Sequence, residues 1–247
     1  MSEFKFPSEE IELPSKGLVY PKDNPLSSGK VEIKYMSAKE EDILTNQSYI
    51  KKGTVLDKLL ESVLVNKKIN VKDLILGDKN ALLIATRILG YGAKYEFLKL
   101  GNVHVVDLTD IENTEFSKKD IVNVGVNEFP FTLPHSKANI TYKILDGHDE
   151  SKIDREIKGL EKINKNNVPA LSTRLKYIIT SVEGDSERKT VREFVDKHLL
   201  AIDSRALRDE IRAKQPDVNL ELTDDAGEEV VIPIGVNFFW PELGWNS

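Results

Sequence analysis

The last thirty-three residues of the chain, Gln215–Ser247, place the strongest constraint on its fold. They contain seven carboxylates and no lysine or arginine, a composition that is typical of disorder in a free terminus. Their apolar residues nevertheless alternate with polar ones on both sides of a turn at residues 224–227, which predicts a β-hairpin. The alternating residues are Val218, Leu220 and Leu222 before the turn, and Val230, Ile232 and Ile234 after it. Because an isolated hairpin is marginal in water, we expect this one to pack on the helices or on a neighbour.

An aromatic run follows this hairpin. It consists of Phe238, Phe239 and Trp240, with Trp245 a few residues later, and it contains both tryptophans of the chain. Large aromatics near a terminus either pack on the chain's own core or anchor a partner, and interfaces are enriched in them. Both alternatives are open, and the four residues are candidate partner-binding residues. If the strand continues, Phe238 and Trp240 face one way and Phe239 the other.

Three arginines form a second candidate contact. Arg205, Arg208 and Arg212 are spaced so that they share one face of a predicted helix. They are either a solvated stripe supported by neighbouring carboxylates or a docking face for an acidic partner or for the chain's own acidic hairpin. Phe4 and Phe6, in the proline-rich N-terminal region, complete the set of candidate partner-binding residues.

Composition narrows the class of protein. With 247 residues, 40% hydrophobic and 31% charged, the chain has the make-up of a soluble globular protein. It lacks an apolar run of about eighteen residues, so we expect no membrane span. It has no cysteine, which excludes disulfides and thiolate zinc sites. Residues 148–214 carry fifteen basic and thirteen acidic side chains, and the end is acidic. Because nucleic-acid binders usually present a basic face, we expect no DNA or RNA partner.

The motifs of common enzymes are absent. The sequence contains no G-x-S-x-G, no phosphate-binding G-x-x-x-x-G-K-[ST] and no G-x-G-x-x-G. The four histidines are scattered, and His148-Asp149-Glu150 is explained more simply as the charged first turn of a helix than as a cation site. We therefore expect no enzymatic activity, no cofactor and no metal.

Prolines dominate the start of the chain. Pro7, Pro14, Pro21 and Pro25 exclude a helix and predict an extended arm lying on a surface or a sheet edge, followed by a strand at 31–35. Ser37–Glu40 is a capping box that opens a helix reaching about residue 51, before Gly53. Thr54 begins a second helix.

The remaining elements follow from periodicity. A third helix is expected from the N-cap candidate Asp78 to Gly90 and Gly92. Strands are predicted at 95–100, 103–108, 129–133 and 140–145, and helices at 149–165, 170–182, 187–200 and 204–214.

These elements predict an α+β fold, with a mostly helical body, short antiparallel hairpins and an extended N-terminal arm. We divide the chain into four segments: an arm and edge strand at 1–36, a helical segment with inserted hairpins at 37–147, a helical segment at 148–214, and the acidic hairpin with its aromatic end at 215–247.

Several stretches, taken in chain order, resemble those of the baseplate hub and hub-assembly proteins of T4-like contractile-tailed bacteriophages. They are Leu13–Pro21, Met36–Leu44, Arg87–Gly92, Leu145–Glu150, Asp203–Arg208 and Phe238–Pro241. None is a catalytic signature. Some members of that family carry paired cysteines in a hairpin, whereas the hairpins predicted here contain none. Each is therefore expected to be held by strand pairing and packing alone.

The resemblance implies a non-enzymatic component or assembly factor of the baseplate hub. Its partners would be other hub or tail proteins. It would be located in the host cytoplasm during assembly or in the tail baseplate of the virion. The number of copies is left open. An alternative from another class is a transient tail-assembly chaperone, absent from the mature virion, that shields a client such as the tape measure protein. The acidic aromatic end and the proline-rich arm would be its peptide-binding surfaces.

Overall fold

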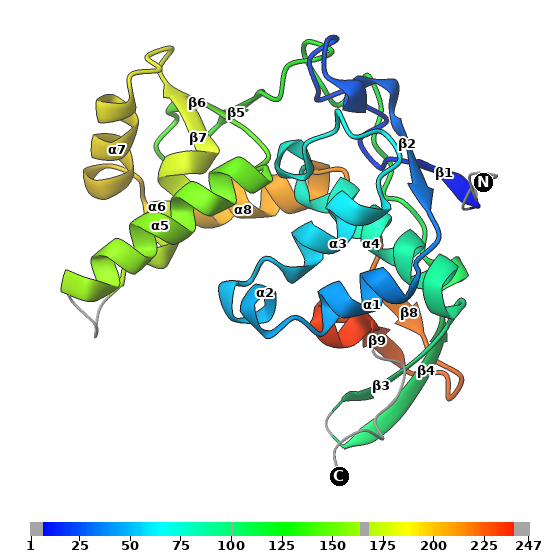
Figure 1. The fold of residues 1–247 in the computed structure, drawn as a ribbon. Helices are drawn as coiled ribbons and strands as arrows, with labels where there is room; N and C mark the ends of the chain where they lie inside the picture. The colour runs from blue at the N-terminus through cyan, green and yellow to red at the C-terminus, as the bar shows by residue number, and fades with distance from the viewer. Residues whose placement is uncertain (1–6, 100, 164–167, 240–247) are drawn as a thin grey trace.

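The computed structural model describes residues 7–99, 101–163 and 168–239 (Figure 1). This part of the chain contains eight α-helices and four small antiparallel sheets. The predicted α+β class is confirmed. The described residues form two halves, one of residues 7–126 together with 215–239 and the other of residues 127–214 between them, so the division falls inside the expected segment 37–147.

The turns of the N-terminal region bury apolar side chains in the core, so the surface alternative for the arm is wrong, whereas its strands do lie at a sheet edge, because they form a two-stranded sheet. Strand β1 (Ser8–Glu12) pairs with β2 (Lys30–Lys34). The turns between them bury five apolar side chains: Leu13, Leu18, Val19, Tyr20 and Leu26. The prolines set turns rather than an extended path, and the turns cross at Gly17, where an added Cβ would lie 2.5 Å from the Ser27 carbonyl oxygen.

The helix expected at 37–51 is two helices. Helix α1 (Ala38–Leu44) ends before Asn46, whose side chain accepts hydrogen bonds from the amides of Ser48 and Tyr49 and so starts α2 (Gln47–Lys52). An asparagine side chain competes for backbone amides in this way, and it outweighs the helical periodicity. The predicted stop at Gly53 and the start of α3 (Val55–Val63) at Thr54 are confirmed.

Helix α4 (Leu76–Tyr91) lies at the centre of the first half. It starts before the predicted N-cap, so Asp78 lies inside its first turn. After α4, strands β3 (Lys94–Lys99) and β4 (Asn102–Asp107) form the predicted hairpin. Strands β8 (Glu221–Thr223) and β9 (Glu229–Val231) form the terminal one, shorter than expected. The two hairpins meet where the Asp225 amide donates to the Val105 carbonyl.

The second half is a three-stranded sheet with helices. Its elements are β5 (Phe129–Thr132), β6 (Asn139–Tyr142), β7 (Ile179–Val182), α5 (Gly147–Ile163), α6 (Ala170–Ile178), α7 (Arg188–Lys197) and α8 (Ala201–Lys214). The helix expected at 170–182 is therefore wrong at its end. Residues 179–182 pair with β6, a place that suits their β-branched side chains. A close approach joins the halves, since a Cβ on Gly147 would lie 2.9 Å from the Lys72 Cα.

Four helices carry a buried carboxylate at their third residue. These residues are Glu40 of α1, Asp78 of α4, Asp149 of α5 and Asp203 of α8. An acidic side chain at this position faces the free amides and the positive end of the helix dipole. Here Glu40, Asp78 and Asp203 also accept hydrogen bonds from segments outside their own helices, and Asp149 forms an ion pair with Lys143 just before its helix. For example, Asp203 accepts from the backbone amides of His135 (2.8 Å) and Ser136 (2.9 Å). The helices are thus tied at their starts to loops.

Asp78 makes the densest of these joints. It accepts from the Ser15 amide (2.9 Å), the Ser15 hydroxyl (2.6 Å) and the Tyr20 hydroxyl (2.5 Å). The Tyr20 hydroxyl in turn accepts from the amide of Ile75. Burial raises the pKa of Asp78, and the hydrogen bonds from Ser15 and Tyr20 offset only part of this.

We expect Asp78→Ala to lower the free energy of unfolding by about 3 kcal/mol or more, because several buried donors of Ser15 and Tyr20 lose their acceptor. Denaturant unfolding measures this effect. The exposed Asp42→Ala on α1 is the control and should change stability by less than about 0.5 kcal/mol. Equal stability of the two variants would show that Asp78 does not hold the N-terminal turns.

Glu40 should make stability depend on pH. Burial opposes its ionisation, but hydrogen bonds from Lys34, Ser37 and Ser62 outweigh this and lower the pKa from 4.5 to about 2. Since the folded pKa is depressed, the stabilisation is complete above pH 4.5 and is lost as the pH falls through about 2. Between pH 4.5 and about pH 2, the free energy of unfolding of the wild type should fall by about 3 kcal/mol more than that of Glu40→Gln. Denaturant unfolding measures this difference. An unchanged difference across this range contradicts the assignment, and the exposed Glu115→Gln is the control.

Candidate functional site

The first candidate contact, the aromatic run, belongs to the chain's own core as far as the structure describes it. Phe238 and Phe239 are fully buried. They lie in a 3-10 helix, Val236–Phe239, and not in a continuing strand, so both rings face inward instead of alternating. The Phe238 ring packs edge-on against Tyr95 at 4.9 Å, and Arg87 Nε donates to the Phe238 carbonyl at 3.1 Å. The prediction that these two phenylalanines anchor a partner is therefore wrong.

The other aromatic candidates, Trp240, Trp245, Phe4 and Phe6, lie outside the described residues.

The arginine candidates do share an exposed face. Arg205, Arg208 and Arg212 project from α8, opposite its buried residues, and the side chains of Arg205 and Arg212 are 80% and 79% exposed. Both pair with Asp209 of the same helix, at 3.8 and 3.5 Å. In the described part of the chain, neither forms an ion pair with the acidic hairpin.

Two half-exposed apolar side chains, Leu200 and Ile202, lie at the start of the same helix. We call these five residues the α8 surface: Leu200, Ile202, Arg205, Arg208 and Arg212. Interfaces are enriched in arginine, and apolar side chains beside it provide area that a partner can bury. The sequence predicted the arginines, but it gave no sign that Leu200 and Ile202 would be exposed, because their spacing fits a buried face equally well.

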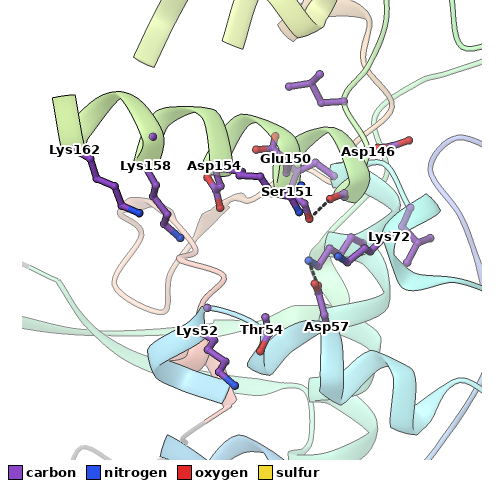
Figure 2. Close-up of a pocket in the computed structure, with 18 residues that line it drawn as sticks. Lys52, Thr54, Asp57, Lys72, Asp146, Glu150, Ser151, Asp154, Lys158 and Lys162 are labelled. Atoms are coloured by element: carbon purple, nitrogen blue, oxygen red, sulfur yellow. Dashed lines mark hydrogen bonds and ion pairs between the residues drawn. The ribbon is translucent and has the colours of Figure 1, made fainter. Parts of the chain in front are cut away.

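A cleft of about 730 Å³ separates α5 from α2, α3 and the segment Val71–Asp73 (Figure 2). On the α5 side its wall is one polar helix face that includes Asp154, Arg155, Lys158 and Lys162. Figure 2 shows Lys158 and Lys162 directed from α5 towards the opposite wall. Sequence spacing does not indicate this site, because its walls come from segments about a hundred residues apart.

The cleft carries an excess of unpaired positive charge. Lys79 pairs with Asp57 across its floor, and Glu150 pairs with Arg174 outside it. Five cationic lining residues take part in no ion pair within the described ranges: Lys52, Lys72, Arg155, Lys158 and Lys162. Only two carboxylates of the lining, Asp146 and Asp154, are likewise outside ion pairs within the described ranges, so the cations outnumber them. Burial raises the pKa of Asp146.

One group of side chains, with His104 and Asp224 buried and Glu228 exposed, resembles a metal site. Ligand atoms of His104, Asp224 and Glu228 lie within 4.8 Å of one another. Both oxygens of Asp224 already have partners, because one accepts from the amides of Ala226 and Glu228 and the other lies 2.7 Å from His104 Nδ1. The hydrogen bond with His104 is the main cause that lowers the pKa of Asp224. The group therefore serves as a joint between the two hairpins.

No protein family, curated protein or solved structure matches the chain. Among the described residues, no helix is long and apolar enough to cross a membrane. The fold and surfaces define an α+β protein with an exposed helix surface and a charged cleft.

The α8 surface should be dispensable for folding. We expect Arg205→Glu with Arg212→Glu to shift the melting temperature by no more than a few degrees, because exposed ion pairs contribute about 0–1 kcal/mol. Thermal unfolding followed by circular dichroism measures this. Lys189→Glu on α7, also exposed, is the control. A loss of about 10 °C or more would mean that the arginines serve the fold.

Proposed function

We propose that this protein is a non-enzymatic component or assembly factor of the baseplate hub of a contractile phage tail, and that it acts through protein contacts. Its partners are other hub or tail proteins. The proposal rests on the resemblance of six stretches and on what those stretches do in the fold.

The observation that carries the proposal is that all six stretches supply buried joints. Leu13–Pro21 contributes Ser15 and Tyr20, which bind Asp78. Met36–Leu44, Leu145–Glu150 and Asp203–Arg208 each contain a buried carboxylate at a helix start. The two remaining stretches, Arg87–Gly92 and Phe238–Pro241, contact each other directly. The guanidinium of Arg87 donates a hydrogen bond to the carbonyl of Phe238. Residues with such roles specify a scaffold, so the resemblance supports a shared framework rather than a shared reaction.

The α8 surface is the place where we expect a hub or tail partner to bind. It combines exposed positive charge with exposed apolar area, and its side chains are not needed to close the core. The chaperone alternative is less well supported. Its expected peptide-binding surfaces include Phe238, Phe239 and the proline-rich N-terminal region, and both phenylalanines and the large apolar side chains of the N-terminal turns are buried.

Purified tails and hub-assembly intermediates from infected cells provide the test. Mass spectrometry should detect the polypeptide in at least one of these fractions. Presence only beside a client, with absence from hub intermediates and finished particles, would favour the chaperone. Absence from every fraction contradicts both functions.

In the same assay, we expect the variant Arg205→Glu with Arg212→Glu to enter these fractions at least about tenfold less than wild type if it binds through the α8 surface. Lys189→Glu is again the control. If both variants enter equally, the partner binds elsewhere on the protein, although the role in the tail can still hold.

A further inference from the structure

The charged cleft has the features of a binding site for an acidic surface. Its unpaired cations stand on both walls, with Arg155, Lys158 and Lys162 on α5 and Lys52 on α2 (Figure 2). All four side chains are exposed. Unpaired like charges that are held together repel one another, and an acidic ligand relieves this repulsion.

The lining also indicates what kind of anion fits. The cleft has no aromatic residue on its walls, and its apolar lining consists of Leu74, Leu76 and Leu145. A nucleotide base therefore finds no ring to stack on. Most of the cations are lysines, which are flexible point charges that suit scattered carboxylates as well as any fixed geometry. The ligand chemistry that matches is an acidic polypeptide surface.

This chain presents such a surface itself. The terminal hairpin exposes Glu221, Asp225, Glu228 and Glu229, and none of these forms an ion pair within the described residues. Glu229 is the cross-strand partner of Thr223, and Thr223 lies two residues after Glu221 on the same strand. Because alternate residues of a strand face the same side of the sheet, the two glutamates share the outer face of the hairpin. Their face also contains the half-exposed Val231.

The cleft and hairpin of one molecule cannot meet. Figure 1 places the outer end of α5 and the strands β8 and β9 on opposite sides of the molecule. Both belong to well-packed parts of the fold, as shown by the buried Ile153 of α5 and Val230 of β9. The two complementary charge sets can therefore neutralise each other only between molecules.

We propose that the basic cleft of one copy binds the acidic terminal hairpin of a second copy. The two surfaces differ, so one contact leaves one cleft and one hairpin open, and further copies add until these ends meet in a ring or the chain of copies stays open. The attraction is mainly electrostatic, so it weakens as salt screens the charges. The inference concerns self-association alone and does not depend on the proposed role in the tail.

Sedimentation velocity with charge reversals tests the proposal. Wild type should exceed its monomer mass of 27.9 kDa at low ionic strength and return to it at about 1 M salt. Lys158→Glu with Lys162→Glu, or Glu221→Lys with Glu229→Lys, should each weaken association at least about tenfold. The variant with all four changes should recover it. The double change Lys118→Glu with Lys119→Glu, at exposed lysines outside the cleft, is the control and should associate like wild type.

Carbodiimide coupling provides a second measurement that does not require new variants. It should join Lys158 or Lys162 to a hairpin carboxylate, and a mixture of isotopically labelled and unlabelled protein should show the link between different copies. A protein that stays monomeric at low salt overturns the proposal. It is equally overturned if all variants associate alike, or if the fourfold variant fails to recover while each variant remains folded.

Discussion

The hydrogen bonds between Asp78 and the turn at Ser15–Tyr20 are the contact on which the first half of the fold depends. A carboxylate is removed from water at the start of the central helix, and burial of this kind is costly unless donors surround it. Ser15 and Tyr20 are those donors. They can reach Asp78 only because the N-terminal turns enter the core. The path of the first thirty residues and the position of α4 thus depend on each other.

The same solution recurs at Glu40, Asp149 and Asp203. In each case the helix start offers a favourable place for negative charge. A second segment donates to Glu40 and to Asp203, for example through the amides of His135 and Ser136, and Asp149 pairs with Lys143 just before its helix. A short sheet or helix alone buries little apolar area in this chain. Polar joints of fixed geometry therefore decide how the small elements are arranged, and apolar packing then adds most of the stability.

The sequence predicts local features better than these joints. Gly53, Thr54 and both hairpins follow rules that act over a few residues. The role of Asp78 does not, because its partners lie about sixty residues away, and the cap preference of aspartate suggested a different start for the helix. Residues 179–182 read as helix until pairing with β6 is known. Similarly, the α8 arginines could be predicted from spacing, whereas the cleft needs two distant walls.

The packing of residues 215–239 against the N-terminal half has a consequence for synthesis. The Arg87 guanidinium and the Tyr95 ring receive Phe238 only after the end of the chain has been made. Residues 127–214 contain their own sheet and helices, and they leave the ribosome earlier. Folding during translation therefore completes the inserted half first, and the half that contains the N-terminus closes last.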